Sequence, residues 1–213
     1  MAKQRRLSRK EKRRVERDQD HLMGILNTKF SMRKIRPITA TQSDLFESYN
    51  EGYNLAAIGT AGTGKTMCAT YLALNDVLQK GEYEKVVIIR SAVQTREQGF
   101  MPGTQAQKEA VFEAPYNDIV NDLFERKDAY NLMKAKGMIE FKTSSFVRGL
   151  TFDNAIIIVD ECQSMTYHEL DSIITRVGES SKIVFCGDTK QDDLATSKNR
   201  ADVTGLHDFL KVL

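Results

Sequence analysis

Eight consecutive residues near position 60 have the types and the spacing of a phosphate-binding loop. They fit the pattern G-x-x-x-x-G-K-[ST] at every fixed position. Glycines allow backbone conformations that are closed to other residues, so successive N–H groups can converge on one phosphate chain. Lys65 would bring a positive charge to the β- and γ-phosphates, and the Thr66 hydroxyl would ligate Mg²⁺. The expected phosphate-binding residues are Gly59, Thr60, Ala61, Gly62, Thr63, Gly64, Lys65 and Thr66.

Two acidic residues, Asp160 and Glu161, directly follow the apolar run at residues 155–159. An apolar strand that ends in acids places carboxylates at the carboxyl edge of a sheet, where α/β folds bind ligands. Asp160 is suited to holding Mg²⁺ through a water molecule, and Glu161 is suited to orienting and deprotonating an attacking water. Taken alone, the pair could be two solvated acids. Together with the loop it predicts a site for nucleotide hydrolysis.

A third polar motif, residues 187–191, follows the apolar run at 182–186. A polar side chain at such a position can sense the γ-phosphate and change its contacts on hydrolysis. We expect Gln191 to have this role and Asp188 to organise the loop. The alternative interpretation is a simple Gly-Asp turn.

The elements that must position these residues alternate along the chain. The expected strands cover residues 55–58, 85–90, 138–142, 155–159 and 182–186. The expected helices cover residues 42–49, 66–78 (closed by Gly81), 107–123, 128–136, a segment that starts at a capping box of Thr166 and Glu169, and 205–213. Several of the strands are apolar on both faces. This pattern predicts an α/β domain with a mostly parallel sheet and helices on both faces.

The charge of the chain is concentrated at its start. The 213 residues carry a formal net charge of +2, yet residues 1–17 contain nine Lys or Arg and only two Glu. We therefore expect a basic tail or helix at residues 1–34 and a single folded domain at residues 35–213. Such a tail is typical of contact with nucleic-acid phosphates, and because residues 1–17 contain no aromatic residue, this segment would bind without sequence specificity. A solubilising tail with no specific partner is the alternative.

Composition also argues against several classes of protein. No apolar run approaches the length of a membrane span, so we expect a cytoplasmic protein without a membrane partner. The three cysteines, Cys68, Cys162 and Cys186, have no spacing typical of a zinc site or a disulfide framework. The histidines also form no metal-like cluster.

Six motifs in this order resemble the PhoH-like ATPases, single-domain relatives of the superfamily 1 helicases. The motifs are Gly59–Thr66, Gly99–Gly103, Phe146–Gly149, Val159–Gln163, Thr175–Gly178 and Gly187–Gln191. The similarity covers residues 35–213, and the Gly-Phe-x-Pro-Gly loop narrows the choice to this family. Two positions depart from the family pattern, because Ser91 stands where proline is usual and Cys162 where alanine is usual. The resemblance implies a RecA-like P-loop NTPase domain.

The resemblance also implies an activity and partners. We expect Mg²⁺-dependent ATP hydrolysis, stimulated by single-stranded RNA or DNA, in an ATPase or a helicase. The alternative is a nucleotide-gated nucleic-acid-binding or assembly factor that does not unwind duplexes. A third interpretation is a small-molecule kinase, which the sequence supports less because nothing in it marks a pocket for a phosphoryl-group acceptor. Arg90 and the 99–103 loop are the expected contacts with a nucleic-acid strand.

Gln42 lies seventeen residues before Gly59, near the place where related helicases keep a glutamine that reads adenine. Its carboxamide could accept from the adenine N6 amine and donate to N7, which would favour ATP over GTP. The alternative is an ordinary glutamine at the start of a helix.

The last expectation concerns assembly. An arginine usually meets the transition-state charge of phosphoryl transfer. Superfamily 1 helicases supply this arginine finger from a second domain, whereas this sequence ends at Leu213. We therefore expect a ring, with six subunits as the predicted number, in which a neighbour supplies the finger. The candidates are Arg148 and Arg176, and for each the alternative is a structural or surface arginine.

Overall fold

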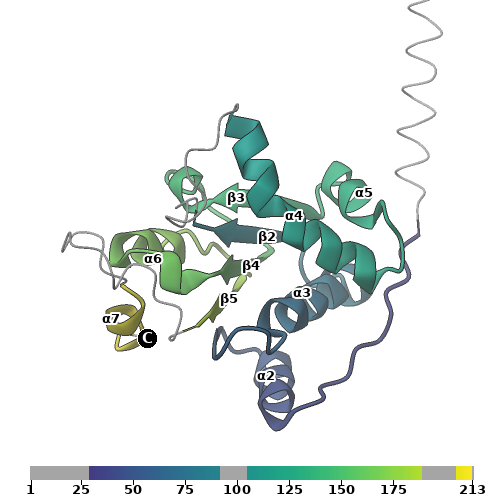
Figure 1. The fold of residues 1–213 in the computed structure, drawn as a ribbon, viewed down its shortest axis with the longest axis horizontal. Helices are drawn as coiled ribbons and strands as arrows, with labels where there is room; N and C mark the ends of the chain where they lie inside the picture. The colour runs from purple at the N-terminus through teal and green to yellow at the C-terminus, as the bar shows by residue number, and fades with distance from the viewer. Residues whose placement is uncertain (1–28, 92–104, 189–204, 213) are drawn as a thin grey trace, which may run out of the picture. The chain divides into compact units, whose positions relative to one another are not determined.

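A five-stranded parallel sheet forms the centre of the domain, with the strand order β1-β5-β4-β2-β3 (Figure 1). The computed structural model describes residues 29–91, 105–188 and 205–212. The strands are β1 (Leu55–Ile58), β2 (Lys85–Arg90), β3 (Ile139–Thr143), β4 (Ala155–Asp160) and β5 (Lys182–Gly187). All five strands expected from the sequence are present, with ends that differ by at most one residue. The prediction of a parallel sheet is confirmed.

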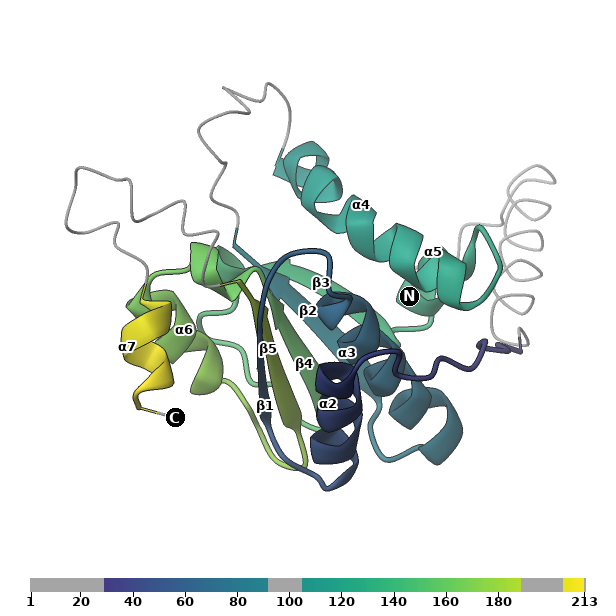
Figure 2. The ribbon, with the colours of Figure 1, turned by 60° about the horizontal axis from the view of Figure 1, so that its bottom comes forward.

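Helices cover both faces of this sheet. In Figure 2, α2 and α3 lie on one side of the strands, and α6 and α7 lie on the other. The helices are α2 (Ala40–Asn50), α3 (Lys65–Asn75), α4 (Gln105–Leu123), α5 (Ala129–Ala135), α6 (Tyr167–Ile174) and α7 (Leu206–Leu210), with 3-10 turns η3 (Ser144–Phe146) and η4 (Cys162–Ser164). The predicted α/β class is therefore confirmed. Among the described residues, no helix combines the length and the apolar character needed to cross a bilayer.

Strand alternation decides which side chains reach the site. Because successive side chains of a strand point to opposite faces, Ile157 and Val159 of β4 pack with Leu170 and Phe209 of α6 and α7. The other set of β4 residues, which ends in Asp160, faces α3 and α4, and Asp160 contacts a side chain from each of these helices. All six residues of β4 are buried, which explains why this strand is the most apolar run in the chain.

Two local predictions can be compared with the structure. The capping box at the start of α6 is present in full: the Thr166 side chain accepts from the Glu169 N–H, and the Glu169 side chain accepts from the Thr166 N–H. The helix expected at residues 66–78 is instead divided into α3 and a π-helical turn, η1 (Asp76–Lys80), before the left-handed C-cap at Gly81. Buried Asp76 forms an ion pair with Lys80 at 2.8 Å within this turn.

Candidate nucleotide-binding site

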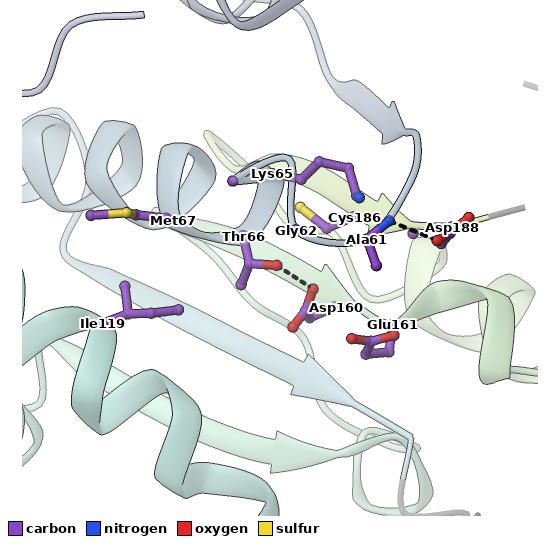
Figure 3. Close-up of a pocket in the computed structure, with 12 residues that line it drawn as sticks. Ala61, Gly62, Lys65, Thr66, Met67, Ile119, Asp160, Glu161, Cys186 and Asp188 are labelled. Atoms are coloured by element: carbon purple, nitrogen blue, oxygen red, sulfur yellow. Dashed lines mark hydrogen bonds between the residues drawn. The ribbon is translucent and has the colours of Figure 1, made fainter. Parts of the chain in front are cut away.

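A pocket of about 310 Å³ lies at the carboxyl edge of the sheet, where the phosphate-type loop meets the ends of β4 and β5 (Figure 3). The loop joins β1 to the first turn of α3, so its amides and the helix N-terminus face the same space. The lining residues are Ala61, Gly62, Gly64, Lys65, Thr66, Met67, Ile119, Asp160, Glu161, Cys186, Gly187 and Asp188. The fold thus brings the loop and both acids predicted from the sequence to one pocket.

The loop needs glycine at two of its three glycine positions. Gly62 and Gly64 have φ values of 74° and 80°, in the left-handed region that side chains disfavour. Gly59 has no such requirement, since its φ lies outside that region and a Cβ would meet no atom within 4 Å. Lys65 Nζ donates to the carbonyls of Gly59 and Thr60 at 2.8 and 2.7 Å. Its ammonium group therefore lies at the loop, within the reach of a phosphate bound there.

Two hydroxyl groups hold the Asp160 carboxylate. Thr66 Oγ1 donates to Oδ1 at 2.8 Å, and Tyr116 Oη of α4 donates to Oδ2 at 2.7 Å. Burial, and then the charge of Asp160, raise the pKa of Tyr116 well above its usual value, so the phenol remains a donor. Tyr116 was not among the residues expected from the sequence, because a tyrosine within a helix ordinarily indicates core packing.

Glu161 has a backbone conformation that is rare for a residue with a side chain, with φ 52° and ψ 41°. Gln163 Nε2 donates to Glu161 Oε2 at 2.5 Å, and Gln163 Oε1 accepts from the Asp188 N–H at 3.0 Å. Asp188 Oδ2 in turn accepts from the Ala61 N–H at 2.8 Å. One chain of hydrogen bonds therefore joins the loop, the end of β5 and the acid at the end of β4. Gln163 had no expected role of its own.

The oxygen atoms in the pocket are of the kind that Mg²⁺ prefers, namely the Thr66 hydroxyl and the Asp160 carboxylate. Within the described residues, no group of three or more His, Cys, Asp or Glu side chains could hold a metal ion. An ion at Thr66 and Asp160 would therefore need further ligands from phosphate and water, as Mg²⁺ in nucleotide sites does.

Gln42 lies beside the loop, because its Nε2 donates to the Thr63 carbonyl at 3.0 Å and its Oε1 accepts from the Ile38 N–H at 2.9 Å. It therefore contacts the phosphate-type loop and also stands in the first turn of α2, where its backbone N–H donates to the Thr39 side chain. Its predicted reading of adenine stays a prediction. Arg90, at the end of β2, is half-buried, and its guanidinium carbon lies 5.8 Å from the centre of the Phe112 ring.

The two candidate finger arginines do not line the pocket of their own chain. Arg148 is exposed in the segment after η3. Arg176 is half-buried, and its Nε has no hydrogen-bond partner among the described residues. Gln191, the 99–103 loop and the basic residues 1–17 lie outside the described residues, so the expectations placed on them stay predictions.

The three cysteines are buried and unbridged. Burial raises the pKa of Cys162 to about 12 and also raises the pKa of Cys68 and Cys186. All three are therefore neutral thiols near pH 7, which makes Cys186 a poor nucleophile although it lines the pocket.

Comparison with known proteins places this chain in a family. A family model described as "PhoH-like protein" matches residues 34–213. The chain belongs to the PhoH-like protein family. A PhoH-like protein of Mycobacterium bovis is 35% identical over 181 residues, which are 83% of this chain and 51% of the relative. Protein PhoH of Escherichia coli is 33% identical over 157 residues, 73% of this chain and 43% of the relative. The chain thus spans about half the length of the curated relatives it matches.

Two solved structures show a more distant similarity. The UvsW helicase from bacteriophage T4 matches with a TM-score of 0.45 and 19% identity, over 89% of this chain and 63% of the helicase. The Sulfolobus solfataricus SWI2/SNF2 ATPase core in complex with double-stranded DNA matches with a TM-score of 0.46 and 13% identity, over 78% of this chain and 36% of that core.

Proposed function

We propose that this protein is a Mg²⁺-dependent ATPase that acts at the pocket between α3 and the ends of β4 and β5. The observation that carries the proposal is the contact of Thr66 with Asp160 at 2.8 Å, in a pocket that Lys65 and Glu161 also line. This contact brings the two oxygen groups of the magnesium pattern together from segments 94 residues apart. Membership of the PhoH-like family supports the same assignment.

Each residue has a part in this proposal. The amides of residues 59–66 and the Lys65 ammonium bind the phosphates, and Thr66 and Asp160 hold Mg²⁺, which neutralises phosphate charge when it is bound. Glu161 accepts a proton from the attacking water, and Gln163 orients its carboxylate. Gln42 reads adenine from its place beside Thr63, and Gln191 senses the γ-phosphate.

The test separates nucleotide binding from turnover. Lys65→Ala should abolish binding of a fluorescent ATP analogue, because the phosphates lose their cation. Glu161→Gln should bind the analogue normally and lose about 10²- to 10⁴-fold in turnover, the usual effect of removing a general base. Binding by fluorescence anisotropy and phosphate release give the two readouts. Normal turnover in Glu161→Gln would refute the assigned base.

We further propose that single-stranded RNA or DNA stimulates this ATPase, in a protein that works as a helicase in the cytoplasm. The basic residues 1–17 and the helicase-like motif at 187–191 support this part of the proposal. Phosphate release should rise when either polymer is added, and polymer binding should weaken as salt increases. Deletion of residues 1–28 should weaken the salt-sensitive component of RNA or DNA binding. Unstimulated turnover with salt-sensitive polymer binding would instead support a nucleotide-gated binding or assembly factor without unwinding.

The proposed active form is a ring, with a hexamer as the expected size. Among the described residues that line the pocket, Lys65 is the only cation, so the transition-state charge has no arginine partner there. A head-to-tail ring would supply Arg148 or Arg176 from the adjacent subunit to each site. Light scattering with ATP and Mg²⁺ measures the mass of this assembly.

A further inference from the structure

Tyr116 of α4 is hydrogen-bonded to Asp160, an acid that lines the pocket. Its hydroxyl donates to Asp160 Oδ2 at 2.7 Å, while Thr66 Oγ1 donates to Asp160 Oδ1 at 2.8 Å. Each carboxylate oxygen is therefore held by one hydroxyl group. Two donors from different helices fix both the rotation of the carboxylate and its plane more firmly than one donor could.

The position of the Tyr116 hydroxyl is itself fixed by packing. Only 1% of the residue is exposed, and its ring lies 5.7 Å from the ring of Phe141 on β3. A second hydroxyl–carboxylate bond, from Tyr130 of α5 to Glu113 of α4 at 2.6 Å, joins α4 to α5. Burial and the neighbouring Phe141 ring thus restrict movement of the Tyr116 ring away from Asp160.

We propose that Tyr116 is a positioning residue that holds Asp160 for Mg²⁺ binding, an inference that rests on the proposed ATPase site. Thr66 is assigned both a bond to Asp160 and a role as a magnesium ligand. The Thr66 hydroxyl would offer an oxygen lone pair to the metal, while its O–H still donates to Asp160 Oδ1. Tyr116 holds the other oxygen, Oδ2, so the two donors together would keep the carboxylate in one orientation toward the ion.

The chain offers a matched control for this role. Tyr130 is also a buried tyrosine whose hydroxyl donates to a carboxylate, and its partner Glu113 lies on the same helix as Tyr116. Neither Tyr130 nor Glu113 lines the pocket. Tyr130→Phe therefore removes a comparable hydrogen bond outside the proposed magnesium site.

The experiment measures binding of fluorescent ADP by the purified protein during a Mg²⁺ titration, and again in EDTA. Mg²⁺ should tighten ADP binding, and the Mg²⁺ concentration that gives half of this gain in affinity should be about 5- to 10-fold higher in Tyr116→Phe than in wild type. The reason is that loss of a partner that orients a metal ligand typically weakens metal affinity by about tenfold or more. Affinity in EDTA should stay within about twofold of wild type, because the phosphate loop is intact. Tyr130→Phe should follow the wild-type curve.

Other outcomes separate the two proposals. An unchanged Mg²⁺ curve in folded Tyr116→Phe, or equal loss of affinity with and without Mg²⁺, would overturn the role of Tyr116 and leave the ATPase proposal standing. A wild-type protein that binds ADP in neither condition would overturn both. Should Tyr116→Phe fail to fold, Phe141→Leu keeps the hydroxyl but loosens its support, and should raise the half-maximal Mg²⁺ concentration about two- to threefold. The absence of that shift would also overturn the inference.

Discussion

Glu161 is held in a left-handed backbone conformation that costs roughly 1–3 kcal/mol for a residue with a side chain. Its neighbours compensate for that strain. Gln163 donates to the Glu161 carboxylate and also accepts from the Asp188 N–H. This one buried carboxamide therefore links the acid that follows β4 to the acid that follows β5. The orientation of the proposed base therefore depends on a residue that would not itself touch the substrate.

Replacement of Gln163 tests this dependence. Gln163→Met keeps a similar volume but removes the donor to Glu161 and the acceptor for Asp188. We expect kcat to fall about tenfold, equivalent to about 1.4 kcal/mol of transition-state stabilisation, with nucleotide affinity within about twofold of wild type. Steady-state phosphate release and a binding titration measure the two effects. A change in KM at unaltered kcat would contradict the positioning role.

The sequence-predicted residues that the structure brings to this pocket belong to contiguous motifs. Lys65, Thr66, Asp160 and Glu161 could be found because a loop or a strand end sets their spacing locally. The contact of Tyr116 with Asp160 spans 44 residues and depends on which face α4 turns toward the sheet. No local pattern carries that information, since an apolar helix face has the same appearance whatever it packs against.

At the scale of the elements, strand ends and helix starts were predicted well because they depend on local chemistry. The full capping box at Thr166 and Glu169 is one example. The division of the helix after the loop into α3 and η1 was not predicted. That change in hydrogen-bond register occurs where Asp76 is buried and pairs with Lys80. Tertiary burial of this kind cannot be read from helix propensity.

The capping box also supports a neighbouring motif. Ser144 Oγ of η3 donates to Glu169 Oε1 at 2.6 Å, while Glu169 Oε2 accepts from the Thr166 N–H at 2.9 Å. The first turn of α6 is thereby tied to η3 and to the Phe146–Gly149 segment that contains Arg148. A weaker cap should loosen this connection as well as the helix.

Thr166→Ala should lower the free energy of unfolding by about 1 kcal/mol, the usual value for an N-cap, and lower Tm by about 2–4 °C. Nucleotide affinity should not change, because Thr166 does not line the pocket. Thermal unfolding followed by circular dichroism measures the shift. Thr175→Ala, at the exposed C-terminal end of the same helix, is the control and should stay within about 0.5 kcal/mol of wild type. Equal effects of both substitutions would argue against a special role for the cap.

At the scale of the whole molecule, the proposed ring makes each ATP site dependent on two subunits. Glu161 would come from one subunit, and Arg148 or Arg176 from its neighbour. Subunits with different defects could therefore complement each other, whereas a site built within one chain could not be rescued in this way.

Mixing experiments test this arrangement. Glu161→Gln subunits and Arg176→Ala subunits should each be inactive alone, and a mixture should recover part of the turnover because some sites combine an intact Glu161 with an intact Arg176. A second mixture, of Glu161→Gln subunits with Arg148→Ala subunits, shows which of the two arginines acts as the finger. Light scattering of each sample checks that mixed assemblies form. A monomer with full turnover would rule out the ring.

The place of β1 in the sheet has a consequence for the order in which a newly made chain acquires its site. β1 leads into the phosphate-type loop, lies at one edge of the described sheet and pairs with β5. The Ile183 N–H even donates to Asn54 Oδ1, 129 residues earlier in the chain. During synthesis on a ribosome, the loop is made early but gains its supporting strand only when β5 emerges. The proposed nucleotide would therefore stabilise the nascent chain only after β5 has paired with β1.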